Sequence, residues 1–131
     1  MNGAGLRNKG HAGERELCAW LTENLGLKEP LTRNIEQVRD GGGDIMLLPP
    51  FSIEVKRQEA LQINKWWNQA KRQRTKSNPV AVLAYRKNRH PWQFMMSLDD
   101  LVKKRYQTGQ DLPITMGPEL FLAIVKRIRG L

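Results

Sequence analysis

The hydrophobic and polar positions of this chain follow two different periods, and together they predict a series of helices and strands. Apolar residues recur at helical spacing in some segments, whereas shorter apolar or alternating runs are typical of strands. Glycines 41–43 and the pair Pro49-Pro50 mark turns. The predicted helices are 12–25, 63–76, 99–106 and 118–129, and the predicted strands are 31–38, 44–48, 51–57, 80–85 and 92–96.

This order of elements predicts the fold class. Helices that alternate with strands are needed to cover a mixed sheet, so we expect an α/β or α+β fold with two or three layers. No repeat or long linker divides the 131 residues, which favours a single domain over 1–131. Residues 1–11 are expected to be mobile, because glycines alternate there with basic residues and apolar anchors are few.

The composition excludes several classes of protein. The longest unbroken apolar run, 80–85, is much shorter than the ~20 residues of a transmembrane helix, and the N-terminal segment lacks the apolar region of a signal peptide. The single cysteine, Cys18, cannot form an internal disulfide, and one Cys with two His disfavours a structural zinc site. We therefore expect an intracellular, cytoplasmic protein that is neither secreted nor attached to a membrane.

An excess of basic residues makes nucleic acid the leading candidate partner. The chain has 22 Lys and Arg against 13 Asp and Glu, a net charge of +9. Such an excess attracts polyanions, DNA first and an acidic membrane surface second, although an ordinary basic protein is a simpler alternative. Segment 65–76 contains basic residues without any acidic one, which suggests a phosphate-binding face: Lys65, Lys71, Arg72, Arg74 and Lys76.

Two tryptophans lie within this basic segment. Trp66 and Trp67 could stack on unpaired bases, but tryptophan at helical spacing lies more often in a hydrophobic core. The basic residues themselves could equally form a solvated helix face.

The few acidic residues indicate a candidate catalytic site. In the predicted strand 51–57, Glu54 and Lys56 point to the same face because side chains alternate along a strand. Asp44 precedes the Pro49-Pro50 turn, so a hairpin brings its carboxylate toward this strand. The simpler alternative is an exposed strand on which Glu54 forms an ion pair with a neighbouring basic residue.

Carboxylates placed in this way suggest a metal site. Two carboxylates and a backbone carbonyl, for which Val55 is the candidate, are the hard oxygen ligands that Mg²⁺ or Mn²⁺ prefers. Lys56 could orient a water molecule or stabilise developing negative charge. Glu14 is a further candidate, since it lies on the core-facing side of the first helix while Glu16 points toward solvent. A carboxylate in a first helical turn also simply favours the helix dipole.

The whole pattern resembles the PD-(D/E)XK nuclease superfamily, and within it the archaeal-type Holliday junction resolvases. The resemblance covers about residues 9–86, and whether the coding genome is that of a phage or a cell stays open. The segments that carry it are Lys9-Gly10, Glu14-Arg15-Glu16-Leu17, Arg33, Asp44-Ile45 and Ile53-Glu54-Val55-Lys56. A Pro that often precedes the first Asp is here Gly43, and the segment after Lys56 is specific to this chain, which leaves the choice of substrate open.

The resemblance implies a restriction-endonuclease-like fold of three layers, with a central mixed β-sheet flanked by helices. It implies a Mg²⁺-dependent endodeoxyribonuclease, with Mn²⁺ as a substitute, that acts as a homodimer on four-way or branched DNA in recombination and repair. The alternatives are a nuclease for flaps, nicks or duplex DNA, and a non-catalytic DNA-binding module of the same fold.

The same resemblance assigns roles to individual residues. The implied metal ligands are Glu14, Asp44, Glu54 and the backbone of Val55, and the implied catalytic cation is Lys56. Gln69, on the border of an apolar helix face, is either a further site residue or an interfacial polar residue. Arg15 and Arg33 match positions that contact DNA phosphates.

The last predicted helix offers one candidate surface for a dimer. Its wide apolar stripe is formed by Leu120, Phe121, Ile124, Val125 and Ile128. The stripe either packs on the sheet of its own chain or contacts a second copy.

Overall fold

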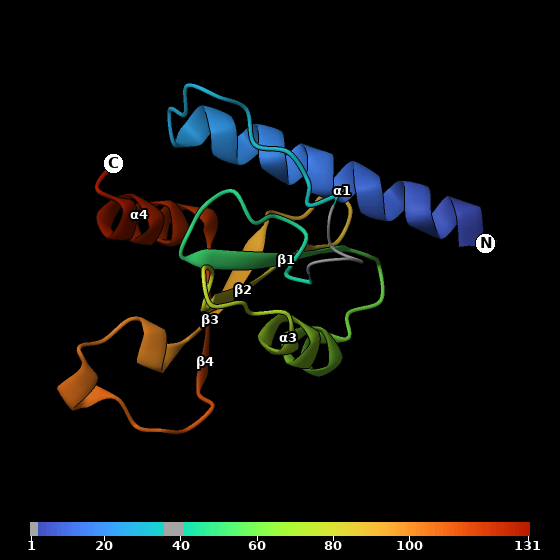
Figure 1. The fold of residues 1–131 in the computed structure, drawn as a ribbon. Coiled ribbons are helices and arrows are strands. Elements are labelled where there is room, and N and C mark those ends of the chain that lie inside the picture. Colours follow the sequence, from blue (N-terminus) through green and yellow to red (C-terminus); the bar gives the residue numbers. More distant parts are fainter. Residues whose placement is uncertain (1–2, 36–40) are drawn as a thin grey trace.

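The computed structural model describes residues 3–35 and 41–131, with side chains described from Gly10 onward. Three α-helices flank a sheet of four strands in this part of the chain (Figure 1). The helices are α1 (Gly3–Asn24), α3 (Ile63–Arg72) and α4 (Pro118–Arg129), and the strands are β1 (Phe51–Arg57), β2 (Val80–Arg86), β3 (Gln93–Ser97) and β4 (Pro113–Met116). Two short 3₁₀ turns, η1 (Leu98–Asp100) and η2 (Lys104–Tyr106), lie between β3 and β4.

The sheet is mixed, as the sequence predicted. Its strands lie in the order β1-β2-β3-β4. Strands β1 and β2 are parallel, and the chain between them crosses over through α3. The pairs β2–β3 and β3–β4 are antiparallel. β1 is therefore an edge strand, which leaves one side of its backbone available to other segments of the chain.

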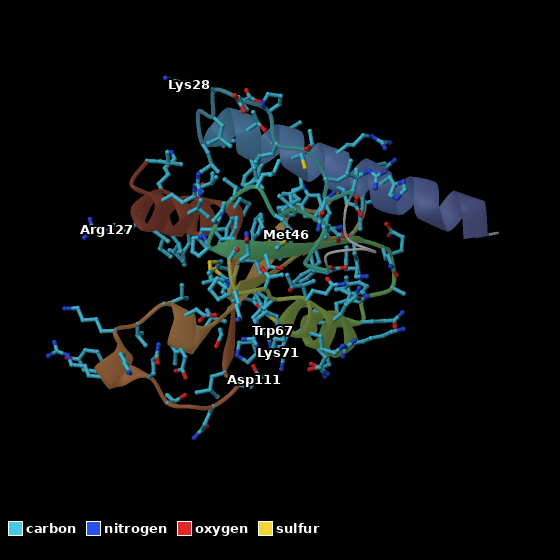
Figure 2. The ribbon with its side chains drawn as sticks, in the orientation of Figure 1. Lys28, Met46, Trp67, Lys71, Asp111 and Arg127 are labelled. Atoms are coloured by element: carbon cyan, nitrogen blue, oxygen red, sulfur yellow. The ribbon has the colours of Figure 1, made fainter. Side chains whose placement is uncertain are left out.

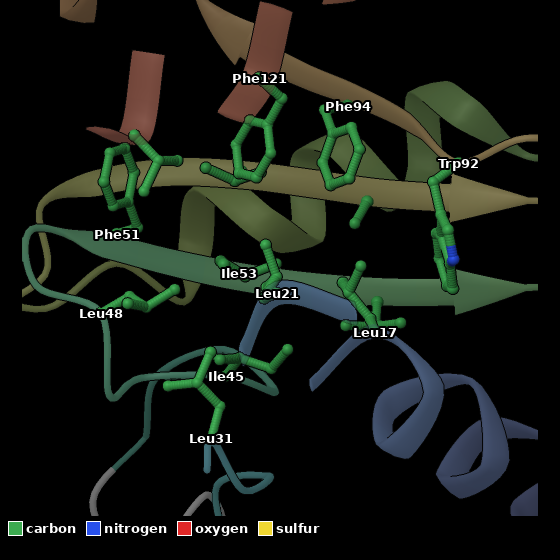
Figure 3. Close-up of a cluster of buried hydrophobic side chains, with 14 of the residues drawn as sticks. Leu17, Leu21, Leu31, Ile45, Leu48, Phe51, Ile53, Trp92, Phe94 and Phe121 are labelled. Carbon is green, nitrogen blue, oxygen red and sulfur yellow. The ribbon is translucent and has the colours of Figure 1, made fainter. Parts of the chain in front are cut away.

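The alternation of side chains along the strands places helices on both faces of the sheet. Ile53 and Val55 face a hydrophobic cluster shared with α1 and α4, in which Phe94 and Phe121 stack at 4.0 Å between ring centroids (Figure 3). Leu83 lies on the opposite face, in the cluster that contains the tryptophans of α3. The predicted three-layer architecture is therefore confirmed.

The apolar stripe of α4 is divided between the core and the surface. Phe121 and Val125 are fully buried, whereas Leu120 and Ile128 are 54% and 42% exposed. Packing on the sheet therefore buries only some residues of the stripe, and the others remain exposed. No helix in the described residues is both long enough and apolar enough to cross a membrane.

Two predicted strands are not strands in the structure. Residues 31–35 are irregular, and 36–38 lie outside the described residues. Segment 44–48 contributes only an isolated bridge, Ile45 to Ile53. Side chains take part in the backbone hydrogen bonding here, because Thr22 Oγ1 accepts from the N–H of Leu31. Gly41 and Gly42 have φ angles of +72° and +91°, which bend the chain out of an extended path.

Helix bounds also differ from the prediction. α1 begins at Gly3 rather than near residue 12, so it includes residues of the segment expected to be mobile; that mobility stays a prediction. α3 ends at Arg72, which leaves Arg74 and Lys76 in the following loop. This loop closes on itself through the Thr75 N–H, which donates to the carbonyl oxygen of Asn78.

The segment between β3 and β4 was predicted as one short helix, 99–106, and forms two separate 3₁₀ turns instead. The Asp99 carboxylate accepts hydrogen bonds from the backbone N–H groups of Thr108 and Gly109, 2.8 and 2.9 Å long. Such bonds compete with a continuous helix. β4 was not predicted, because it has only four residues and begins with Pro113.

Candidate active site at the edge of the sheet

Asp44 and Glu54 meet at the free edge of β1, as the predicted turn at Pro49-Pro50 requires. Both side chains are almost completely buried, with exposed fractions of 7% for Asp44 and 2% for Glu54. Asp44 Oδ2 accepts the backbone N–H of Val55 at 2.8 Å. The carboxylate of one segment is thereby fixed against the backbone of the strand that carries the other.

The backbone of Val55 faces this edge. Two residues earlier, both the N–H and the carbonyl of Ile53 bond to Ile45 across the free edge of β1. Backbone groups of alternate residues in a strand point to the same edge. The carbonyl of Val55 therefore points to the same edge as the Asp44 carboxylate. It lies beyond the isolated bridge between Ile45 and Ile53.

Glu54 is held by two neighbours through one of its two oxygens. Gln69 Nε2, from α3, donates to Glu54 Oε1 at 3.0 Å, and Lys56 Nζ lies 3.5 Å from the same oxygen. Oε2 is buried and accepts no hydrogen bond from the described residues. A buried carboxylate oxygen without a donor is unusual and is costly unless a cation or water pairs with it.

Burial and mutual repulsion perturb the carboxyl groups of the site. Burial, followed by the charge of Asp44, raises the pKa of Glu14 from 4.5 to about 7, while Arg33 and Arg15 oppose the rise. The same two causes raise the pKa of Glu54 to about 8, against the lowering effect of Lys56. Asp44 therefore interacts with both glutamates, and burial together with this repulsion favours their protonated forms when no cation is bound.

These carboxylates line a cleft of about 320 Å³. Its other walls come from the end of β1 and from α1, and the complete set is Gly10, Glu14, Asp44, Glu54, Val55, Lys56, Arg57 and Gln58. A larger cavity of about 770 Å³ lies between α1 and residues 30–35, and its surface is mostly apolar. The smaller cleft is the candidate site because it contains the perturbed carboxyl groups.

The donor atoms of the cleft suit a hard divalent cation. Glu54 Oε2, the Asp44 carboxylate and the Val55 carbonyl are all oxygens, the ligands that Mg²⁺ and Mn²⁺ prefer. In the described part of the chain, no three His, Cys, Asp or Glu side chains are grouped closely enough to hold a metal by themselves. A carbonyl or water ligand would therefore have to complete the coordination.

Gly43 is needed for packing at this edge. A Cβ on Gly43 would lie 2.7 Å from the carbonyl oxygen of Ile53, which is closer than atoms can approach. The Gly43 N–H donates to Ser52 Oγ at 3.1 Å, and its carbonyl accepts from Asn34 Nδ2 at 3.0 Å. The bare backbone thus lets the loop that carries Asp44 lie against β1.

The basic residues predicted to contact DNA lie in separate groups, of which Lys71, Arg72 and Arg74 line one pocket at the end of α3. Arg15 and Arg33 lie near Glu14, whose pKa they lower. Lys65 and Arg72 are exposed on α3. Lys71 forms an ion pair with Asp111, whose negative charge partly offsets that of the lysine (Figure 2).

The two tryptophans of α3 are core residues. Trp66 and Trp67 are 3% and 4% exposed, so neither presents a ring to solvent. Trp67 Nε1 donates to Asp111 Oδ1 at 3.1 Å, which ties α3 to the loop before β4. The core interpretation of these residues is therefore correct.

Glu16 has a role that the sequence did not indicate. It was expected to point toward solvent, but its carboxylate lies 3.3 Å from Arg57 Nη1 and 3.0 Å from Arg86 Nη2. The two arginines end the parallel strands β1 and β2 and are partners in their register. Only the pairing of β1 with β2 brings them together, so no local signal could have indicated this contact.

The raised pKa values predict how stability depends on pH in the absence of divalent cations. In the unfolded chain Glu14 and Glu54 lose their protons near pH 4.5, whereas in the folded state they keep them to about pH 7 and 8. The folded state therefore binds more protons within this window, and its stability is expected to fall as pH rises through it. Thermal unfolding in EDTA from pH 4.5 to 8.5 measures the effect.

Two controls accompany this measurement. The substitution Glu54→Gln removes one titrating group and should flatten the fall, and Mg²⁺ should oppose the fall in the unchanged protein. Stability that stays constant or rises across the window in EDTA would contradict the prediction.

Most of the chain matches the model of a known protein family. A family model described as "Phage putative PDDEXK endonuclease" matches residues 5–116. No curated protein and no solved structure matches the chain. The matched segment extends from α1 to β4 and includes every residue that lines the cleft.

Proposed function

The chain belongs to this family of phage PD-(D/E)XK endonucleases, and from that premise we propose that it is a Mg²⁺-dependent endodeoxyribonuclease that hydrolyses phosphodiester bonds in branched DNA. The observation that carries the proposal is the meeting of Asp44 and Glu54 at the edge of β1, with one buried oxygen of Glu54 left without a donor. A scaffold that served only to bind DNA would gain nothing from carboxylates buried at this cost.

Asp44, Glu54 and the Val55 carbonyl are the proposed ligands of the divalent cation. Glu14, which lines the same cleft beside Asp44, is proposed as a further ligand whose side chain moves toward the cation on binding, since the three carboxylates are not grouped closely enough as they stand. Bound there, Mg²⁺ or Mn²⁺ would polarise a phosphoryl oxygen and lower the pKa of a water molecule. The burial of these carboxyl groups next to one another supports this assignment, because a bound cation would offset both their desolvation and their mutual repulsion.

Lys56 and Gln69 act beside these ligands. Lys56 is 19% exposed, so its ammonium group remains in contact with solvent while it lies next to Glu54. From this place it can donate a hydrogen bond to a water molecule or to a phosphoryl oxygen that gains charge. Gln69 orients the Glu54 carboxylate from α3 and is a positioning residue.

DNA as the substrate follows from the charge and from the family. The net charge of +9 favours a polyanion, and Arg15 and Arg33 lie next to the cleft where they can contact phosphates. The preference for four-way junctions rests on the resemblance to junction resolvases. It implies a homodimer, because symmetric cleavage of two strands needs two active sites and this chain supplies one.

The test is a comparison of DNA substrates. Labelled four-way junction, flap, single-stranded and linear duplex DNA are incubated with the protein in Mg²⁺ or EDTA. We expect cleavage only with Mg²⁺, and continued cutting of the junction in an excess of linear duplex. Sedimentation at micromolar concentration should show a dimer of the 15.1 kDa chain.

The other outcomes identify the alternatives. Equal loss of cutting on junction and duplex in the competition would indicate a general nuclease for flaps, nicks or duplex DNA. DNA binding without cleavage of any substrate in Mg²⁺ or Mn²⁺ would indicate a non-catalytic module. A monomer with full junction-cutting activity would contradict the homodimer.

A further inference from the structure

We propose that the turn between β2 and β3, residues 86–90, is a second contact for the DNA backbone, reached by a DNA strand that leaves the cleft across the ends of β1 and β2. The proposal rests on the proposed function of the cleft and extends the path of its substrate. None of the residues assigned to DNA binding above belongs to this turn.

The cleft and the turn are continuous. Arg57 lines the cleft and is the register partner of Arg86, the last residue of β2. The Gln58 N–H donates to the carbonyl oxygen of Arg86 at 3.2 Å, which joins the strand ends beyond the sheet. A second cleft of about 290 Å³ begins on the other side of Arg86 and is lined by Leu61, Tyr85, Arg86, Lys87, His90, Pro91 and Gln93.

This surface has an excess of positive charge. Arg57 and Arg86 share the single carboxylate of Glu16, so one positive charge of the three groups remains uncompensated. Lys87 is half-buried and Arg89 is exposed on the turn itself. The acidic residue at this place, Glu59, reduces the excess but does not cancel it.

The turn is held in one conformation by its own hydrogen bonds. Its backbone is closed by the His90 N–H, which donates to the Lys87 carbonyl at 3.2 Å. The Asn88 N–H donates to Glu59 Oε1 at 2.8 Å, which fixes the turn to the segment after β1. A cationic surface that is already ordered loses little conformational entropy when it binds a phosphate.

Arg89 has a backbone conformation that points to a specific role. Its φ angle is +62°, in the left-handed region that side chains other than glycine and asparagine rarely adopt. A residue with a side chain is under strain in this conformation. A glycine would relieve it, so the chain keeps a guanidinium group at the exposed end of the turn despite this cost.

The first test compares two double substitutions of equal charge. Lys87→Gln with Arg89→Gln removes one lysine and one arginine from the turn. Lys126→Gln with Arg127→Gln removes the same pair from the exposed end of α4, where Figure 2 labels Arg127 far from the arrowhead of β1. Binding to labelled duplex and junction DNA is measured by fluorescence anisotropy in EDTA over a series of salt concentrations.

In the turn variant, loss of two phosphate contacts should reduce the magnitude of the negative slope of log K for DNA binding against log salt by about two units. It should also weaken binding about tenfold or more at 0.1 M salt. The α4 variant should stay within about twofold of the unchanged protein. Equal effects of both variants would show that only net charge matters and would overturn the proposal. So would full affinity in the turn variant.

The second test predicts a gain of affinity. Glu59→Gln removes a negative charge beside the turn but keeps an oxygen that can accept the Asn88 N–H, so DNA should bind more tightly. Glu29→Gln makes the same change at the exposed segment after α1, at the end of the molecule where Figure 2 labels Lys28, and should leave affinity unchanged. Tighter binding could not result from a loss of folding, which can only weaken the interaction. Unchanged or weaker binding in a Glu59→Gln variant that thermal unfolding shows to be folded would overturn the proposal.

These binding measurements are independent of cleavage. If the unchanged protein cuts no DNA in Mg²⁺ but the turn variant still loses affinity selectively, the proposed enzymatic function fails and the DNA path stands. If the protein cuts DNA normally and neither the turn nor Glu59 affects binding, the path fails and the enzyme stands.

Discussion

DNA cleavage is expected to disappear in Glu54→Gln and in Asp44→Asn, while DNA binding survives. Each substitution removes one negative charge from the proposed metal site without removing bulk. An Asn at position 44 keeps an oxygen for the Val55 N–H, and a Gln at position 54 keeps one for Gln69 Nε2. Because several kcal/mol of barrier reduction depend on the cation, the single-turnover rate should fall about 10³-fold or more.

The measurement has three parts: single-turnover cleavage in Mg²⁺, the same reaction in EDTA, and anisotropy of bound DNA. Glu119→Gln, at an exposed position on α4, makes the same charge change outside the cleft and should cleave normally. Thermal unfolding shows whether each variant is folded. Full activity in EDTA, or in either cleft variant, would refute the assignment of these carboxylates.

Lys56→Ala is expected to lower the cleavage rate by about 10² or more with little change in DNA affinity. The substitution removes a cation that lies 3.5 Å from Glu54 Oε1 and faces the cleft, where negative charge develops on the phosphate. Lys56 also lowers the pKa of Glu54, so its loss should weaken metal binding near neutral pH. The rate is therefore measured at saturating Mg²⁺, where only the direct effect remains.

A variant of α3 provides the contrast. Lys71→Ala with Arg72→Ala should weaken binding to all DNA sequences and reduce the salt dependence of binding. The rate at which bound DNA is cleaved should change little. Arg72 should account for most of this loss, because Lys71 is already paired with Asp111. If Lys56→Ala lost affinity and the α3 variant lost only rate, the roles of the two groups would be reversed.

Much of the candidate site could be predicted from short stretches of sequence. Alternation along a strand is a local property, so Glu54 and Lys56 could be placed on one face without knowledge of the fold. The turn at Pro49-Pro50 is equally local, and it was enough to direct Asp44 back toward β1. The usual burial of tryptophan at helical spacing correctly indicated that Trp66 and Trp67 are core residues.

The segment before Asp44 could not be predicted in this way. Its apolar residues are compatible with a strand, but residues 31–35 have none of the ladder hydrogen bonds that a strand needs. Backbone groups there bond instead to Thr22 Oγ1 and to the carbonyl of Asp44, atoms that only the folded chain brings near. β-structure depends on partners distant in sequence, and this dependence limits any prediction from one strand alone.

The sequence by itself determined which face each side chain of β1 occupies, which helix faces are apolar and which residues can ligate a cation, because these properties depend on periods of a few residues and on side-chain chemistry. The tertiary structure alone decided the contacts between charges that are far apart in the sequence. Glu16 meets Arg57 and Arg86 because β1 and β2 end side by side, and Lys71 of α3 meets Asp111 in the loop before β4. An ion pair between long side chains places no requirement on the residues next to it in the sequence. The local pattern therefore gives no sign of such a pair.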